Sequence, residues 1–136
     1  METSFESKIG KVALSDERIF DFLSDFNNLK SYIPADKITN WQSDGESCRF
    51  TVNGMGNVAL KIVEKEPYKH IKISGDGMNK QNFFFWVQLK QVETNDTRVK
   101  LTIKADMNPM MKMMVAKPVQ KFLDVLIDGF EKMPFA

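Results

Sequence analysis

The sequence has little of what metal sites, redox sites and nucleic-acid interfaces are built from. Its 136 residues include one cysteine and one histidine, which excludes an intrachain disulfide and any histidine-rich metal or acid–base cluster. The 19 basic and 18 acidic residues leave a formal charge of +1, which argues against general electrostatic binding to nucleic acid or anionic membrane. We therefore expect no metal, no cofactor and no nucleic-acid partner.

Long hydrophobic runs are also absent. No window approaches the roughly 18 uncharged apolar residues of a membrane helix, so we expect no stable membrane insertion. The first 15 residues lack a basic stretch followed by an apolar one, which predicts no secretory signal and a cytoplasmic protein. A content of 43% hydrophobic and 27% charged residues is typical of a folded chain, and no linker or repeat divides residues 1–136. These observations predict one domain with one core.

The hydrophobic pattern predicts a strand, two short helices, six further strands and a long helix. The first strand covers Thr3–Ala13 with a bend at Gly10. Ser15 is placed to cap the first helix, and Asp25 the second, which Pro34 ends. Short turn-rich links between the later strands favour an antiparallel meander. Those strands are Ile38–Ser43, Ser47–Asn53, Asn57–Glu66, Lys69–Gly75, Gln81–Glu93 and Thr97–Met107.

The strands alternate between apolar and polar positions, so the sheet should have one dry face. For example, Leu101 and Ile103 share a face opposite Lys100 and Lys104. A one-sided sheet needs a cover, and residues 109–132 supply an amphipathic helix that is long enough to cross it. Asn108 is placed to cap this helix, with Pro109 at its first position. Pro118 predicts a kink in that helix or a new start. The apolar stripe is Val119, Phe122, Leu123, Leu126, Ile127, Phe130 and Met133.

This order of elements, with four local patterns, resembles the START/Bet v 1-like (SRPBCC) superfamily, especially its small bacterial polyketide cyclase/dehydrase-like members. The patterns are Val12-Ala13-Leu14-Ser15, the run from Glu17 to Asp25, Tyr32-Ile33-Pro34, and Asn108-Pro109 before the apolar helix. The resemblance implies an α+β helix-grip fold. In that fold a curved seven-stranded antiparallel sheet wraps a long C-terminal helix, with two short helices between strands 1 and 2. It also implies an apolar cavity between sheet and helix, in which relatives carry lipids, polyketides or quinones and some catalyse cyclisation or dehydration.

Five of the nine methionines lie within eight positions: Met107, Met110, Met111, Met113 and Met114. Methionine is flexible and polarizable, so such a group suits a wall that adapts to variable apolar ligands. Filling of irregular space under the helix is the alternative. The resemblance to ligand-carrying proteins favours the cavity wall.

The run Phe83-Phe84-Phe85-Trp86 is the second unusual feature. Alternation turns Phe83 and Phe85 toward the helix, and Phe84 and Trp86 toward the outer face. We expect a bulge or an overlying loop to bury the outer pair. A partner surface, including a homodimer contact, is the alternative.

Chemical groups for catalysis are sparse. His70 should face solvent, and Cys48 should be a small buried hydrophobe rather than a nucleophile. The polar side chains that could project inward are Cys48, Asn40, Gln91 and Tyr32, and none has a catalytic signature. We therefore assign no catalytic residue. The glycines at Gly54 and Gly56 indicate a hairpin turn, with a gate over the pocket as an alternative.

The sequence thus predicts a non-enzymatic protein that binds or transports a hydrophobic small molecule such as a lipid, polyketide or quinone-like compound. A polyketide cyclase or dehydratase in the same cavity, and a protein-interaction module with a filled core, are the alternatives. The expected wall residues are Phe50, Val58, Leu60, Ile73, Phe85, Val87, Leu101, Ile103, Met107, Met111, Met114 and Phe122.

Overall fold

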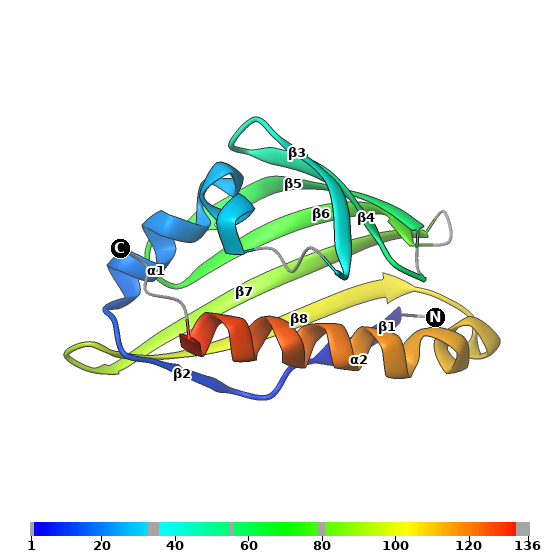
Figure 1. Cartoon of the computed structure of the whole chain (residues 1–136). Coiled ribbons are helices and arrows are strands. Elements are labelled where there is room, and N and C mark those ends of the chain that lie inside the picture. The colour runs from blue at the N-terminus through cyan, green and yellow to red at the C-terminus, as the bar shows by residue number, and fades with distance from the viewer. Residues whose placement is uncertain (1, 33–35, 55, 79–80, 133–136) are drawn as a thin grey trace.

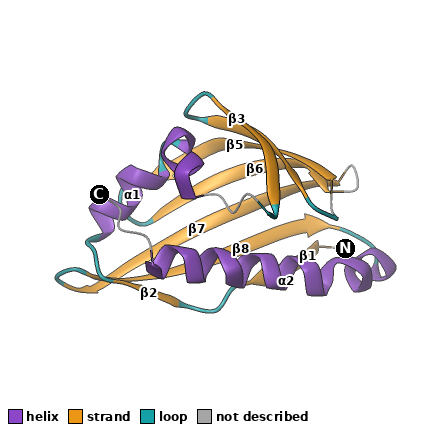
Figure 2. Cartoon of the chain, viewed as in Figure 1, coloured by secondary structure: helices purple, strands orange, loops and turns teal. Residues whose placement is uncertain are grey.

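The computed structural model describes residues 2–32, 36–54, 56–78 and 81–132. An antiparallel sheet curves around a long C-terminal helix, as Figure 1 shows. The elements in chain order are β1 (Glu2–Glu6), β2 (Gly10–Val12), α1 (Asp16–Leu23), the 3-10 helix η1 (Phe26–Tyr32), β3 (Ile38–Ser43), β4 (Ser47–Val52), β5 (Gly56–Glu66), β6 (His70–Met78), β7 (Gln81–Glu93), β8 (Asp96–Asp106) and α2 (Pro109–Lys132). The sheet order is β1-β8-β7-β6-β5-β4-β3, with β2 also paired to β8. Figure 2 separates the helical elements from the sheet. The predicted helix-grip arrangement is confirmed.

The first predicted strand is divided into β1 and β2, which both pair with β8. The break covers residues 7–9, and Gly10 begins β2 instead of marking a bend within one strand. Ser7 bridges the break, because its backbone N–H donates to the Leu101 carbonyl at 2.8 Å and its Oγ accepts from the Leu101 N–H at 2.9 Å. The side chain thus replaces a backbone partner that the ladder loses.

Gly10 allows close approach of α2 to the sheet. A Cβ at this position would lie 2.7 Å from Cγ2 of Ile127, closer than real contacts allow. Ile127 is completely buried, so a side chain at position 10 would push the helix away from its packing site. The glycine therefore serves the helix–sheet contact.

Side-chain caps begin both α-helices, as predicted. Ser15 Oγ accepts from the Arg18 N–H at 3.2 Å, and Asn108 Oδ1 accepts from the Met111 N–H at 2.8 Å. Pro118 lies inside one uninterrupted helix, so the predicted alternative of a new start there is wrong. Burial of the residues that follow Pro118 stabilises the helix despite the lost backbone hydrogen bond.

Acidic side chains of α2 fix its position against β2 and the link that precedes it. Asp124 Oδ1 accepts from the Lys8 N–H at 3.1 Å, and Glu131 Oε2 accepts from the Lys11 N–H at 2.9 Å. A hydrogen bond between the Lys8 and Asp128 side chains raises the pKa of the lysine and lowers that of the aspartate. These contacts lie along one side of α2 and therefore set which of its faces turns toward the concave side of the sheet.

The predicted apolar stripe of α2 divides into two rows. Val119, Leu123, Ile127 and Phe130 are buried, while Phe122 and Leu126 are partly buried against the same core. Met133 lies outside the described residues. No helix in the described ranges is long and apolar enough to span a membrane.

Candidate functional site

The expected wall residues occupy three environments. Leu60, Met111 and Phe122 are half-buried, and Met114 is 68% exposed. The remaining eight are buried on the concave side: Phe50, Val58, Ile73, Phe85, Val87, Leu101, Ile103 and Met107. Met114 is therefore not in an enclosed wall, because it lies farther around the helix from the buried row than Met111 does.

The methionine cluster does not act as one unit. Met107 is buried and Met111 is half-buried, but Met110 and Met113 are 74% and 81% exposed. Neither of the two expectations, core filling or an enclosed cavity wall, holds for the exposed members. The helical period separates neighbouring methionines onto different sides of α2.

A row of half-buried apolar side chains follows one side of α2. Met111, Val115, Phe122 and Leu126 are spaced by four, seven and four residues, so they share a face. This face lies beside the buried row that contains Leu123. Because α2 lies closest to β1, β2 and β8, the half-buried row is free to face the rest of the concave surface. We call these four residues the α2 row.

Trp41 faces the core, although the alternation of side chains along β3 predicts that it faces outward. Counting from buried Ile38, strict alternation would turn Asn40 inward and Trp41 outward. The β3–β4 register instead shifts between Thr39 and Gln42, and Asn40 adopts a φ of 57°. The Trp41 ring consequently stacks on Phe50, with centroids 5.5 Å apart and planes at 21°. The bulge has re-aimed the indole.

Asn40 is thereby corrected from an inward candidate to an outward one. It is exposed, and its Nδ2 donates to Thr51 Oγ1 at 3.4 Å on the outer face. Asparagine tolerates positive φ better than most residues, so its identity was the available signal for a bulge.

The other polar candidates show no acid–base arrangement. Gln91 is exposed, and its Oε1 accepts from the Asp16 N–H at 2.9 Å, which anchors the start of α1 instead of entering the core. His70 Nε2 lies 2.8 Å from Glu64 Oε2, on the face opposite buried Ile71. The side chain of Tyr32 lies outside what the structure describes.

Cys48 is buried, as expected, with 3% of its surface exposed. Burial, followed by the nearby charge of Asp44, raises the pKa of the thiol to about 12. The thiol is therefore protonated at neutral pH, and a thiol is a poor nucleophile compared with a thiolate. This chemistry agrees with a hydrophobic role.

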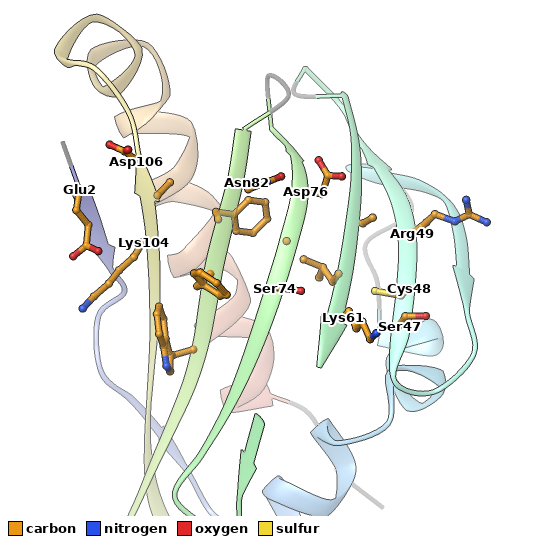
Figure 3. A pocket seen from close by; sticks show the side chains of 17 residues that line it. Glu2, Ser47, Cys48, Arg49, Lys61, Ser74, Asp76, Asn82, Lys104 and Asp106 are labelled. Carbon is orange, nitrogen blue, oxygen red and sulfur yellow. The ribbon is translucent and has the colours of Figure 1, made fainter. Parts of the chain in front are cut away.

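The outer face of the sheet carries a groove of about 1040 Å³ that was not predicted. Figure 3 shows its side chains across the sheet, with α2 behind the strands. Two small residues lie among the larger ones: Ser74 pairs with Lys61 and Phe84, and Ala59 pairs with Arg49 and Asp76. The groove opens where these two small side chains lie among larger ones.

Phe84 and Trp86 are not covered in the way we expected. Phe84 is 44% exposed, and both residues pair in regular register with Ser74 and Lys72 of β6. Lysine side chains provide the partial cover instead, since Lys72 Nζ lies 4.5 Å from the Phe84 ring centroid and 5.3 Å from that of Trp86. The bulge-or-loop expectation is wrong for this described part of the sheet.

The hairpin expected at Gly54 and Gly56 joins β4 to β5. Both glycines have positive φ, 84° and 94°, and Gly56 pairs with Val52 at the start of the ladder. Met55 lies outside the described residues. The turn is confirmed.

Residues 3–132 match the family described as polyketide cyclase / dehydrase and lipid transport. The chain belongs to this family. Membership implies a cavity for hydrophobic ligands. No curated protein matches the sequence.

Solved structures confirm the fold. Norcoclaurine synthase from Thalictrum flavum is similar with a TM-score of 0.79 at 12% identity, over 97% of this chain and 93% of that one. A conserved protein from Geobacillus kaustophilus has a TM-score of 0.64 at 15% identity, over 97% and 91% of the two chains. A Rhizobium loti protein gives 0.65 at 16% identity, over 96% of each chain. At these identities the likeness concerns the fold alone.

Proposed function

We propose that this protein binds or transports a hydrophobic small molecule, such as a lipid, polyketide or quinone-like compound, between the concave face of its sheet and α2. The α2 row carries the proposal. Four apolar side chains stay half-buried on the side of the helix next to its fully buried row, which is the arrangement that an apolar ligand would complete. Family membership supports the same assignment.

Burial of apolar surface would supply the affinity. At about 25 cal/mol per Å², each 100 Å² of ligand and wall surface removed from water contributes about 2.5 kcal/mol. Buried aromatic and aliphatic residues such as Phe50, Val58 and Phe85 would form the far wall, and the α2 row the near wall. Entry would lie near the start of α2 and the hairpin at Gly54 and Gly56, where the turn could act as a gate.

Native mass spectrometry of freshly purified protein tests the proposal, followed by solvent extraction of any retained compound. We expect a mass above that of the bare chain and an apolar compound in the extract. A dimer that carries no compound would favour the protein-interaction alternative. Turnover of the extracted compound on incubation with protein would favour the cyclase or dehydratase alternative.

A matched pair of variants locates the site. Met111→Glu places a charge in the α2 row, whereas Met113→Glu places the same charge two residues away at a position that is 81% exposed. We expect Met111→Glu to reduce the retained compound at least tenfold and Met113→Glu to leave it unchanged, because only the first charge would be desolvated by the ligand. Equal retention in both variants would contradict the site.

A further inference from the structure

We propose that the indole Nε1–H of Trp41 is the polar contact for the ligand, and that the ligand carries a neutral hydrogen-bond acceptor such as a ketone, ester or quinone oxygen. This inference rests on the proposed function and adds the chemical class of the ligand.

A β-bulge in the backbone of β3 turns the Trp41 side chain inward. Two residues of β3, Asn40 and Trp41, stand opposite one residue of β4, and Asn40 takes a positive φ. The result is that Trp41 stacks on Phe50, one of the expected wall residues, at the end of the sheet farthest from β1. Bulges that re-aim a single side chain are common beside functional sites.

The Trp41 nitrogen lacks a partner where it needs one. The residue is half-buried, but its Nε1 atom is fully buried and has no hydrogen-bond partner among the described residues. An indole nitrogen can only donate, so an acceptor must come from elsewhere. Leaving a buried donor unsatisfied costs about 1–3 kcal/mol, which a ligand oxygen that displaces the side chains over this nitrogen would recover on binding.

The surroundings favour a neutral acceptor. No charged residue is buried in the described ranges, where the buried polar residues are Thr3, Ser7, Thr97 and Thr102, on β1, the link after it and β8. Cys48, two residues before Phe50 on the same strand, is a protonated thiol at neutral pH. A carboxylate placed there would be desolvated without a buried counter-ion among the described residues, whereas a carbonyl oxygen would need only the indole N–H.

Three probes of similar shape separate these chemistries. They are 2-acetylnaphthalene, which has a ketone oxygen, 2-isopropenylnaphthalene, in which a methylene group replaces that oxygen, and 2-naphthoate, which is anionic. Binding of each to the wild type and to Trp41→Phe is measured by calorimetry. The hydrocarbon is the more apolar probe and therefore gains more from burial alone. The informative quantity is the ratio of the affinities of the two neutral probes. We expect Trp41→Phe to shift this ratio about tenfold against the ketone, and 2-naphthoate to bind more weakly than the ketone.

Nitrogen-15 NMR of the wild type provides a readout that needs no variant. The chain has two tryptophans, and Trp86 lies on the outer face as an internal control. We expect the Trp41 indole N–H resonance to move downfield with the ketone but not with the hydrocarbon, while the Trp86 resonance stays in place with both. This measurement holds even if Trp41→Phe folds poorly.

The outcomes separate the two levels of the proposal. Suppose that both neutral probes bind, that Trp41→Phe leaves the ratio of their affinities unchanged, and that the Trp41 resonance moves equally with both. The role of Trp41 is then overturned, and the apolar site stands. Tighter binding of 2-naphthoate than of the ketone would overturn the neutral class. If no probe binds and no retained compound is found, the site itself fails, and the inference fails with it.

Discussion

The two faces of β7 show how one residue type takes opposite roles within a single strand. Phe83 and Phe85 point to the concave side and are 5% and 8% exposed, whereas Phe84 between them is 44% exposed on the outer face. The three residues have the same intrinsic hydrophobicity. Parity along the strand, not residue type, decides which of them stabilises the core.

The space next to small residues is filled on the concave face and open on the outer face. On the concave side, a Cβ at Gly75 would lie 2.1 Å from the Phe83 ring, so the ring occupies the space that the glycine leaves. On the outer face, the space above Ala59 and Ser74 belongs to the groove. At Gly75 the concave face is thus packed by complementary shapes, while the outer face keeps an opening next to Ala59 and Ser74.

The largest expected contrast comes from truncating neighbouring phenylalanines. Phe85→Ala should lower the free energy of unfolding by about 3–5 kcal/mol, because it leaves a cavity in the core. Phe84→Ala should lower it by about 1 kcal/mol or less, because 44% of the residue's surface is already exposed in the folded state. Urea unfolding of both variants measures the difference. Similar losses would mean that the outer ring is covered in solution.

Cysteine reactivity tests the same contrast on β4. Native Cys48 should react with iodoacetamide far more slowly than a cysteine introduced by Arg49→Cys in a Cys48→Ala background. Arg49 is the adjacent residue and is exposed on the outer face, whereas the Cys48 thiol is buried and has a pKa of about 12. Comparable rates at pH 8 would show that the concave face opens readily.

The raised pKa of Cys48 also predicts a pH effect. The folded protein holds the thiol proton up to about pH 12, whereas the ordinary pKa of the thiol is 9.0. Stability gained from the neutral thiol should therefore be complete below pH 9 and decline between pH 9 and about 12. The unfolding free energy of the wild type, minus that of Cys48→Ala, should decrease across this window. A constant difference would contradict the burial of the thiol.

The smallest expected effect concerns the lysine over the outer rings. Lys72→Gln removes the charge that lies 4.5 Å from the Phe84 centroid and should lower the unfolding free energy by about 0.5–1 kcal/mol. Lys90→Gln, at an exposed position of β7, should change it by less. Equal effects of the two variants would show that net charge, rather than the ring contact, is responsible.

Much of the fold follows from local pattern. The six later strands, the cap residues Ser15 and Asn108 and the long helix from Pro109 were predicted because side-chain period and capping chemistry act over a few residues. The break at residues 7–9 was misplaced. It depends on Ser7 reaching Leu101, a partner 94 residues away.

The candidate site was less predictable for the same reason. Alternation along β3 placed Asn40 inward, and only the pairing with β4 shows the extra residue that turns Trp41 toward Phe50. Likewise, the sequence shows five clustered methionines, but the anchoring of α2 on β2 determines that Met111 is half-buried and Met113 exposed.

By itself, the sequence determined which residues are apolar, their period and their turn and cap chemistry, and these define a one-sided sheet and a helix to cover it. Only the tertiary structure decided which side of α2 keeps a half-buried row, where the outer groove opens and that the Trp41 nitrogen lacks a described partner. Local patterns act over single turns and strand pairs. The site, by contrast, depends on register and helix rotation, which contacts between distant segments set.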